Sequence, residues 1–254
     1  QQHPDKQPSF ISFSSAMHSV IAMDENDKPL TSCITWADNR SEGWAHKIKE
    51  EMNGHNIYKR TGTPIHPMTP LSKITWIVNE HPETAAKAKK YIGIKEYIFK
   101  KLFDQYVVDH SLASAMGMMN LKTLAWDEEA LAIAGITPDH LSKLVPTTAI
   151  FHNCNPELAA MMGIDPQTPF VIGASDGVLS NLGVNAIKKG EIAVTIGTSG
   201  AIRTIIDEPQ TDEKGRIFCY ALTENHWVIG GPVNNGGIVL RWIRDEFASS
   251  EIET

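Results

Sequence analysis

FVIGASDGVLSNLGVNAIKKGEIAVTIGTSGAI, residues 170–202, is the stretch of this chain that decides its fold. Residues 170–174 form an apolar run that predicts a short buried strand, and residues 175–177 then turn the chain into a helix with a repeating apolar face. Asp176 therefore stands where a strand ends. Because ligands of open α/β sheets bind outside the carboxyl ends of strands, we expect its carboxylate to face a binding site.

A hairpin of small residues follows further along the same stretch. Residues 191–196 and 201–206 are rich in β-formers and predict its two strands. The loop between them consists of Gly197, Thr198, Ser199 and Gly200. Its backbone amides and hydroxyls can approach a phosphate without obstruction from large side chains. A base and a phosphate cradle are two of the parts that phosphoryl transfer requires.

Each of these two features also has an ordinary interpretation. Asp176 can be no more than the N-cap of the following helix, and the Gly-Thr-Ser-Gly loop can be no more than a tight turn. The residues by themselves leave both alternatives open.

Strands and helices alternate through the rest of the chain. We expect strands at residues 10–13, 19–23 and 30–36, and a helix after Asp38 that stops at Gly54. Further helical periods occur at residues 71–78, 95–102, 127–133, 155–162 and 237–247. Strands and hairpins fill most of the chain between residues 190 and 237. This order indicates an α/β fold.

Two early segments carry side chains suited to a polyol. Met17 and His18 stand at the tight entry to a strand, where a thioether can lie against a sugar and an imidazole can hydrogen-bond a hydroxyl. Trp36 offers an apolar ring face, and Asp38 offers acceptors for hydroxyl groups. The alternatives are an ordinary polar histidine, a core tryptophan and an aspartate that caps the next helix.

Composition limits the classes of partner. The 254 residues are 42% hydrophobic and 21% charged, as in a globular enzyme, and the net charge of −7 argues against nucleic acid as a partner. The three cysteines, Cys33, Cys154 and Cys219, are odd in number and widely spaced, which suits a reducing cytoplasm and predicts no metal site. No apolar run approaches the ~18 residues of a membrane span, so we expect no membrane partner.

The block at residues 170–202 resembles two motifs of the FGGY carbohydrate kinases. In that family an aspartate after a Gly-rich strand deprotonates the sugar hydroxyl, and a T-x-G-T-[ST]-G hairpin meets the phosphates of ATP. The hairpin pattern is matched position by position by Thr195, Gly197, Thr198, Ser199 and Gly200. Residues 14–18 resemble the family's sugar-binding turn, and residues 36–40 resemble its Trp-x-Asp-x-Arg segment. Similar segments follow in order, so the resemblance covers nearly the whole chain.

The resemblance implies a fold and a division of the chain. The fold is the actin-like ATPase fold of two ribonuclease-H-like domains, which is an α/β fold. Residues 1–175 correspond to the C-terminal portion of the first, sugar-binding domain. Residues 176–254 correspond to the N-terminal portion of the second domain, on the phosphate and nucleotide side. The glycine-rich residues 230–237 are a weaker candidate for that side.

The resemblance also implies an activity and its site residues. A kinase of this family uses ATP and Mg²⁺, with Asp176 as general base and no metal ligand assigned to this chain. The expected nucleotide contacts are Gly197, Thr198, Ser199 and Gly200. The expected substrate contacts are Met17, His18, Trp36, Asp38, Arg40 and Gly177. A homodimer stays open as an assembly.

Within the family, FSSAMHS at residues 13–19 together with WADNR at residues 36–40 is most similar to the gluconate kinases of Gram-positive bacteria. Gluconate differs from a neutral sugar by its carboxylate, which a guanidinium binds in bidentate fashion. Arg40 is the first candidate for that contact. Arg203 and Lys73 are rivals that the sequence does not separate, and a solvated lysine is the ordinary interpretation of Lys73.

Two other functions stay open. The first is a kinase for another polyol such as xylulose or glycerol, although Met17 and His18 argue against glycerol and Ala16 in place of glutamine weakens xylulose. The second is a sugar-acid-binding piece that cannot transfer phosphate. Family members are roughly twice as long and begin with an Asp-x-Gly-Thr-[ST]-Ser loop that does not occur here, so we expect a central fragment of a longer enzyme.

Overall fold

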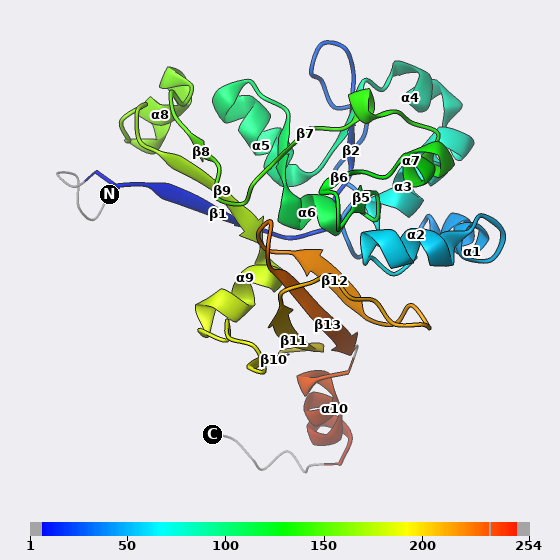
Figure 1. The fold of residues 1–254 in the computed structure, drawn as a ribbon. Coiled ribbons are helices and arrows are strands. Elements are labelled where there is room, and N and C mark those ends of the chain that lie inside the picture. The colour runs from blue at the N-terminus through cyan, green and yellow to red at the C-terminus, as the bar shows by residue number, and fades with distance from the viewer. Residues whose placement is uncertain (1–6, 234, 248–254) are drawn as a thin grey trace.

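The computed structural model describes residues 7–233 and 235–247. Figure 1 shows a larger upper part that holds the first strands and most of the helices, and a lower part formed by a second sheet. Helix α9 (Asp176–Gly183) leads from the upper part into the lower one. The chain is therefore an α/β structure, as its sequence predicts.

The strand that precedes Asp176 is the central strand of the first sheet. The order is β1 (Ile11–Ser15), β9 (Phe170–Ser175) and β8 (Ile150–Phe151), with β1 parallel and β8 antiparallel to β9. Helices α5 (Ile94–Phe103) and α8 (Pro156–Met162) pack on it through apolar clusters. A group of phenylalanines fills the space between them: Phe13, Phe99, Phe103, Phe151 and Phe170. Burial of these rings fixes the direction in which β9 presents its end.

A helical layer beside this sheet surrounds the largest hydrophobic core. Its members are α1 (Glu42–Glu51), α2 (Gly54–Thr61), α3 (Pro70–Glu80), α4 (Pro82–Lys87) and α7 (Glu128–Ala134). Short ladders and turns connect them: β2 (Ile21–Met23) with β3 (Lys90–Ile92), β4 (Val107–Asp109) with β7 (Lys143–Val145), β5 (Met119–Asn120) with β6 (Ala125–Trp126), helix α6 (His110–Ser114) and the 3-10 turn Pro138–His140.

The second sheet is antiparallel throughout. Its order is β10 (Ile192–Ile196), β11 (Gly200–Ile206), β13 (Trp227–Val233) and β12 (Phe218–Ala221). Helix α10 (Gly237–Phe247) follows β13 and lies at the lower end of the molecule in Figure 1. The hairpin predicted from residues 191–206 is therefore present as β10 and β11.

Strand β12 fastens the second sheet to the upper part of the molecule. The backbone amide of Ala221 donates to Ser114 Oγ (3.0 Å), and that of Cys219 donates to the carbonyl of Gly62 (2.8 Å). Thr147 Oγ1 donates to the carbonyl of Leu222 (2.7 Å). The two parts thus meet at β12 as well as at the junction of β9 and α9. The division into domains at residues 1–175 and 176–254 stays a prediction.

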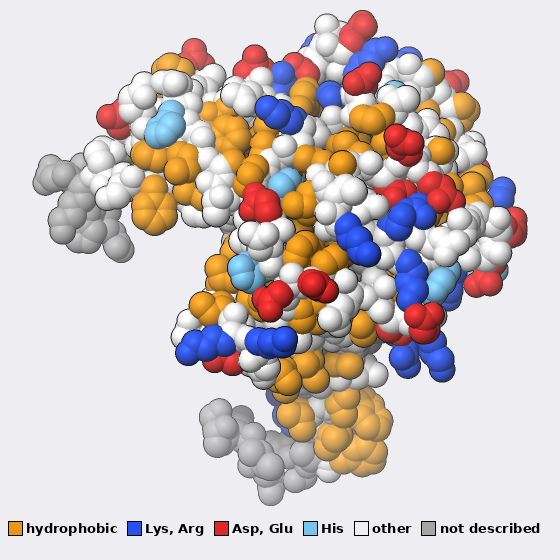
Figure 2. Space-filling view, viewed as in Figure 1, with side chains coloured by type: hydrophobic (Ala, Val, Ile, Leu, Met, Phe, Trp, Pro, Cys, Tyr) orange, Lys and Arg blue, Asp and Glu red, His pale blue; other side chains and the backbone are white. Residues whose placement is uncertain are grey.

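Hydrophobic side chains are exposed along the lower part. Ile196 is 73% exposed on β10, and Leu240 and Phe247 are each 73% exposed on α10. Figure 2 shows the hydrophobic side chains of α10 gathered at the bottom of this face of the molecule. Among the described helices, none is both long enough and apolar enough to cross a membrane.

Two local expectations are wrong. Residues 30–36 make only one isolated bridge, Ile34 with Val20, because the amide of Ala22 donates to Thr31 Oγ1 (3.1 Å) instead of to a strand carbonyl. Gly54 does not end a helix but begins α2. The chain reverses one residue earlier, at Asn53, which adopts the left-handed conformation with φ 58°.

A bulge in β9 sets the end of the strand. Ser12 pairs with Val171 and Ser14 pairs with Ala174, so Phe13 alone faces two residues of β9. One of these is Gly173, whose φ of 68° is left-handed and at which a Cβ would collide with the carbonyl oxygen of Phe13. Only glycine satisfies both conditions.

We predict that Gly173→Ala lowers the free energy of unfolding by about 2–4 kcal/mol, because the new methyl group must displace the backbone of β1. Urea denaturation followed by circular dichroism measures the change.

The matched control is Gly183→Ala, at a position in the last turn of α9 where a Cβ would meet nothing within 4 Å. That variant should be unchanged or stabilised by up to about 1 kcal/mol. Equal effects of the two substitutions would contradict the requirement for glycine at the bulge.

Candidate active site

Asp176 lies at the corner between β9 and α9 with its carboxylate exposed. Its Oδ1 accepts only from the neighbouring amide of Gly177 (2.7 Å) among the hydrogen bonds of the described residues. The N-cap of α9 is Ser175, whose Oγ accepts from the amide of Val178 (3.4 Å). The alternative that Asp176 is the helix cap is therefore wrong, and its carboxylate is available for another role.

Ser111 on α6 holds this corner in place. Its Oγ lies 3.0 Å from Ser175 Oγ and accepts from the amide of Ser175 (3.2 Å). Both serines are fully buried. A buried hydroxyl pair of this kind fixes the backbone on which Asp176 stands, since either hydroxyl left unpaired would be costly.

A buried ion pair supports the same corner from behind. Lys95 Nζ lies 2.5 Å from Asp109 Oδ2 and donates to the carbonyl of Ile172 in β9 (3.0 Å). Asp109 also caps α6 by accepting from the amide of Leu112 (3.0 Å). Burial lowers the pKa of Lys95 and raises the pKa of Asp109, and the charge of each partner opposes the other's shift. The pair links β9 to α5 and α6.

The hairpin loop has backbone N–H donors that its own hydrogen bonds do not use. The amide of Gly197 donates to the carbonyl of Ser199 (2.8 Å), which makes the loop tight. Within the described residues, the amides of Thr198 and Ser199 have no acceptor, and both side chains are exposed. The tight-turn alternative describes this backbone correctly but leaves those two amides unused. They are suited to an oxyanion such as a phosphate.

The start of α10 packs directly against this loop. The amide of Gly236 donates to the carbonyl of Thr198 (2.9 Å), and that of Gly237 donates to the carbonyl of Gly197 (2.6 Å). A Cβ at Gly236 would lie 2.7 Å from the carbonyl oxygen of Ser199. Gly236 and Gly237 therefore allow the backbone to pack closely against the hairpin loop. Asn234 of the same candidate segment lies outside the described residues.

Lys73 joins three segments of the expected sugar site. Its Nζ donates to the carbonyls of His18 (2.7 Å), Thr35 (2.7 Å) and Met68 (2.8 Å), which uses all the donors of an ammonium group. The residue is 0% exposed, and burial lowers its pKa to about 8. The interpretation of Lys73 as a solvated lysine is wrong.

Met17 and His18 lie where the first part of the chain approaches the corner. The methyl group of Met17 is 3.0 Å from the position of a Cβ on Gly177. His18 adopts a left-handed backbone (φ 69°) and is buried, which together with the Lys73 charge lowers its pKa to about 3. Its Nδ1 has no hydrogen-bond partner among the described residues. A buried ring nitrogen without a partner is suited to a ligand hydroxyl.

Trp36, Asp38 and Arg40 form a more exposed group. Trp36 is 61% exposed, so the core interpretation of this ring is wrong. Asp38 does not cap α1, whose N-cap is Ser41. Instead, both oxygens of Asp38 accept from Arg40 Nε (2.8 Å each), and Arg40 Nη2 lies 2.7 Å from Asp38 Oδ2. The Arg40 guanidinium also lies 5.3 Å from the centre of the Trp76 ring.

Two residues of the site escaped the sequence analysis. Ser111 and Tyr220 reach it from α6 and β12, which are distant from residue 176 in the sequence. The ring of Tyr220 lies edge-on to that of His18, with centroids 6.3 Å apart. Alternation along β12 offered a signal only for burial of Tyr220, and nothing in the local pattern marked Ser111 as a neighbour of Ser175.

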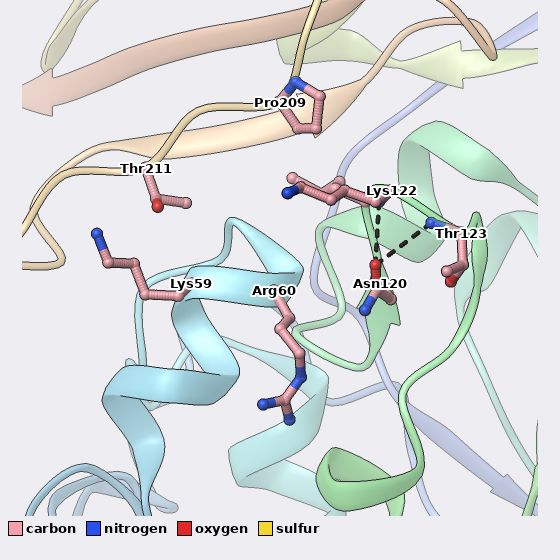
Figure 3. A pocket seen from close by; sticks show the side chains of 8 residues that line it. Lys59, Arg60, Asn120, Lys122, Thr123, Pro209 and Thr211 are labelled. Carbon is pink, nitrogen blue, oxygen red and sulfur yellow. Dashed lines mark hydrogen bonds between the residues drawn. The ribbon is translucent and has the colours of Figure 1, made fainter.

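A separate hollow lies on another side of the molecule. It has a volume of about 260 Å³ and lies between α2, the turn at residues 120–123 and the segment with Pro209 and Thr211 (Figure 3). Two of its three cations are engaged, since Lys59 pairs with Glu213 (2.6 Å) and Arg60 pairs with Asp127 (2.6 Å), while Lys122 makes no ion pair among the described residues. None of the predicted site residues lines it.

Comparison with known proteins shows what this chain is similar to. The profile of the FGGY family of carbohydrate kinases, N-terminal domain, matches residues 1–183. A curated gluconokinase from Bacillus licheniformis is 97% identical over 254 residues, which are 100% of this chain and 50% of that protein. The chain thus spans about half the length of this relative.

Solved structures agree with this relationship. A gluconate kinase from Lactobacillus acidophilus superposes with a TM-score of 0.95 at 42% identity, over 99% of this chain and 51% of that one. A ligand-bound xylulose kinase from the same organism superposes with a TM-score of 0.93 at 44% identity, over 96% of this chain and 50% of that one.

We predict that Lys73→Met lowers the free energy of unfolding by about 2–4 kcal/mol, because three buried carbonyls lose their donor. Urea denaturation measures this change in the free energy of unfolding. Lys87→Met, on the exposed face of α4, is the control and should change stability by less than about 0.5 kcal/mol. A Lys73 variant as stable as this control would contradict the role of the ammonium group.

The pKa of His18 predicts acid sensitivity. The unfolded chain binds a proton on this ring below pH 6.5, whereas the folded chain does so only near pH 3. The stability that neutral His18 contributes is therefore full above pH 6.5 and is lost as the pH falls toward 3. Between pH 6.5 and 5, wild type should lose about 1.6 kcal/mol more than His18→Gln.

Urea denaturation at several pH values measures this difference, with His46→Gln at an exposed position as control. Burial raises the pKa of Glu96 to about 7, but Glu96 is present in every variant and cancels in the comparison. Identical pH profiles for wild type and His18→Gln would contradict a buried neutral imidazole.

Proposed function

Because this chain belongs to the FGGY family of carbohydrate kinases, we propose that it is the sugar-binding and base-carrying part of a gluconate kinase. The reaction transfers the γ-phosphoryl group of ATP to the terminal hydroxyl of D-gluconate and gives 6-phosphogluconate. The observation that carries the proposal is the exposed carboxylate of Asp176 at the end of β9, which is not needed as a helix cap and precedes Gly177, against which Met17 packs.

The choice of gluconate rests on sequence similarity. The relative that is 97% identical is a gluconokinase. The two structures from Lactobacillus acidophilus do not separate gluconate from xylulose, since their identities to this chain are 42% and 44%. Xylulose therefore remains the competing substrate, and direct comparison of the two sugars in one assay distinguishes them.

Asp176 acts as the general base in this proposal. The terminal hydroxyl of gluconate donates its proton to the carboxylate as its oxygen forms a bond to the γ-phosphorus. The bond from that phosphorus to the bridging oxygen breaks, and ADP leaves with the electron pair. Ser175 and Ser111 keep the carboxylate at a fixed position, which matters because positioning supplies much of the rate in phosphoryl transfer.

The hairpin would receive the phosphate groups of the nucleotide. The amides of Thr198 and Ser199, which have no acceptor among the described residues, fit an oxyanion together with the exposed hydroxyls of both residues. Gly197 and Gly200 keep this loop free of bulky side chains. ATP supplies the phosphoryl group when it is bound.

Mg²⁺ in kinases is usually held by one or two carboxylates together with the phosphates of the nucleotide, and not by a site built from protein alone. Among the described residues, no group of three or more histidine, cysteine or acidic side chains is placed to hold a metal ion. We therefore derive no step through Mg²⁺, although kinases generally use the ion with ATP.

The remaining roles complete the proposal. His18 offers its unpartnered Nδ1 to a sugar hydroxyl, Met17 and Trp36 offer apolar surface to the carbon chain, and Asp38 with Arg40 borders the same region. Gly177 lets the side chains of Met17 and Arg203 pack close to the backbone next to the base, which places them beside the proposed substrate. The proposal includes a cytoplasmic location and no nucleic-acid or membrane partner, and it leaves a homodimer open.

We predict that Asp176→Asn abolishes turnover while the affinity for gluconate stays within several-fold, because the amide keeps the shape of the side chain but cannot accept the proton. The assay measures ADP release with gluconate, xylulose or glycerol as the acceptor of the phosphoryl group. It uses a protein of the relatives' full length that carries this sequence, while calorimetry measures gluconate binding.

The control is Asp207→Asn, at an exposed carboxylate after β11, which should leave turnover unchanged. Turnover like that of wild type in Asp176→Asn would sink the assignment of the base. Faster turnover of xylulose than of gluconate by the unsubstituted protein would sink the assignment of the substrate.

A further inference from the structure

The sequence offers three cations for the carboxylate of a sugar acid, and the structure removes the first. Lys73 donates to three carbonyl groups and is 0% exposed. An ammonium group has three protons, so none remains for a ligand. Lys73 builds the site but cannot bind the carboxylate.

The charge of the second candidate, Arg40, is already compensated. Arg40 Nε donates to both carboxylate oxygens of Asp38 (2.8 Å each), and Arg40 Nη2 lies 2.7 Å from Asp38 Oδ2. The hydrogen bond from Arg40 also holds the pKa of Asp38 below its usual range, so the pair stays ionised. A second carboxylate at this guanidinium would meet the negative charge of Asp38.

The third candidate, Arg203, lies beside the catalytic corner. Its Nη2 and Nε are 3.7 and 3.8 Å from the position of a Cβ on Gly177, where the methyl group of Met17 also lies at 3.0 Å. Alternation along β11 places Arg203 on the same face as the buried Ala201 and Ile205, which directs it toward the upper part of the molecule.

Arg203 keeps most of its hydrogen-bonding capacity. Nη1 donates to Thr195 Oγ1 (3.2 Å), and no ion pair of Arg203 occurs within residues 7–233 and 235–247. Burial lowers the pKa of Arg203, and the nearby carboxylate of Asp176 opposes that shift. A half-buried guanidinium with one neutral partner is strongly suited to a carboxylate, because a bidentate pair satisfies both groups.

We infer that Arg203 binds the carboxylate of the sugar acid and thereby selects an acid over a neutral polyol. The inference rests on the proposed gluconate kinase function. The carbon chain of the acid lies along Met17, its terminal hydroxyl reaches Asp176, and its carboxylate pairs with the free edge of the Arg203 guanidinium. Thr195 holds the opposite edge of that guanidinium.

The test compares gluconate with D-glucitol, which carries a neutral CH₂OH group in place of the carboxylate. Arg203→Met and Arg203→Lys are assayed in a protein of the relatives' full length that carries this sequence. Arg203→Met should raise KM and the calorimetric Kd for gluconate about 10- to 100-fold, as expected for loss of a charge-assisted pair, with kcat within several-fold. Competitive inhibition by D-glucitol should change less than about 3-fold, because no charge is involved.

Conservative and control variants refine the result. Arg203→Lys should recover part of the gluconate affinity, since it keeps the charge but not the bidentate geometry. Arg241→Met, at an exposed position on α10, should behave as wild type. Urea denaturation of each variant shows that it is folded.

Three results would overturn the inference. Unchanged gluconate affinity in Arg203→Met would leave the side chain a purely structural role through Thr195. A fall in kcat with unchanged gluconate affinity would place the guanidinium on the transferred phosphoryl group. A larger and equally selective loss of affinity in Arg40→Met would assign the carboxylate to Arg40.

The same assay separates this inference from the proposed function. An unsubstituted protein that neither binds nor phosphorylates gluconate would contradict the function itself. An active protein whose gluconate affinity is unaffected by Arg203→Met would contradict the role of Arg203 alone.

Discussion

The proposed sugar side of this site depends on one buried cation. Lys73 has no carboxylate partner among its hydrogen bonds, and its charge is compensated by three carbonyl dipoles from segments that are far apart in the sequence. Those segments carry His18, Trp36 and the loop before α3. Because a buried ammonium group tolerates no missing acceptor, each segment is held at a definite distance from the others. The same arrangement removes Lys73 from competition for the ligand.

The corner that carries Asp176 depends on hydrogen bonds that cross between elements. Ser111 reaches Ser175 from α6, Lys95 reaches Ile172 from α5, and Asp109 joins the two helices. Strand β12 then anchors the second sheet to the same helix α6 through Ser114. The corner that carries Asp176 and the sheet that carries the loop at residues 197–200 are therefore both hydrogen-bonded to one small helix of five residues, α6.

Local patterns predicted the parts that local interactions determine. The strand before Asp176, helix α9 and the hairpin at residues 191–206 were all readable, because their apolar periods and small-residue turns are contiguous. The expected α/β fold of the actin-like ATPase type is confirmed by structures at 42% and 44% identity. Residues 30–36 were mispredicted because a threonine hydroxyl replaces a ladder bond there. Ser111, Tyr220 and the saturation of Lys73 arise from tertiary contacts, which no window of sequence reveals.

The bulge at Gly173 limits how this protein can change in length. Successive residues of a strand point to opposite faces, so one residue inserted or deleted between Val171 and Ala174 would turn the following residues to the other side of the sheet. Ser175 would lose its hydrogen bonds to Ser111, and Gly177 would lose its contact with Met17. Loops elsewhere on the surface can accept insertions at small cost, whereas this strand must keep its residue count. The direction in which Ser175 and Asp176 point therefore depends on the single extra residue that the bulge adds to β9.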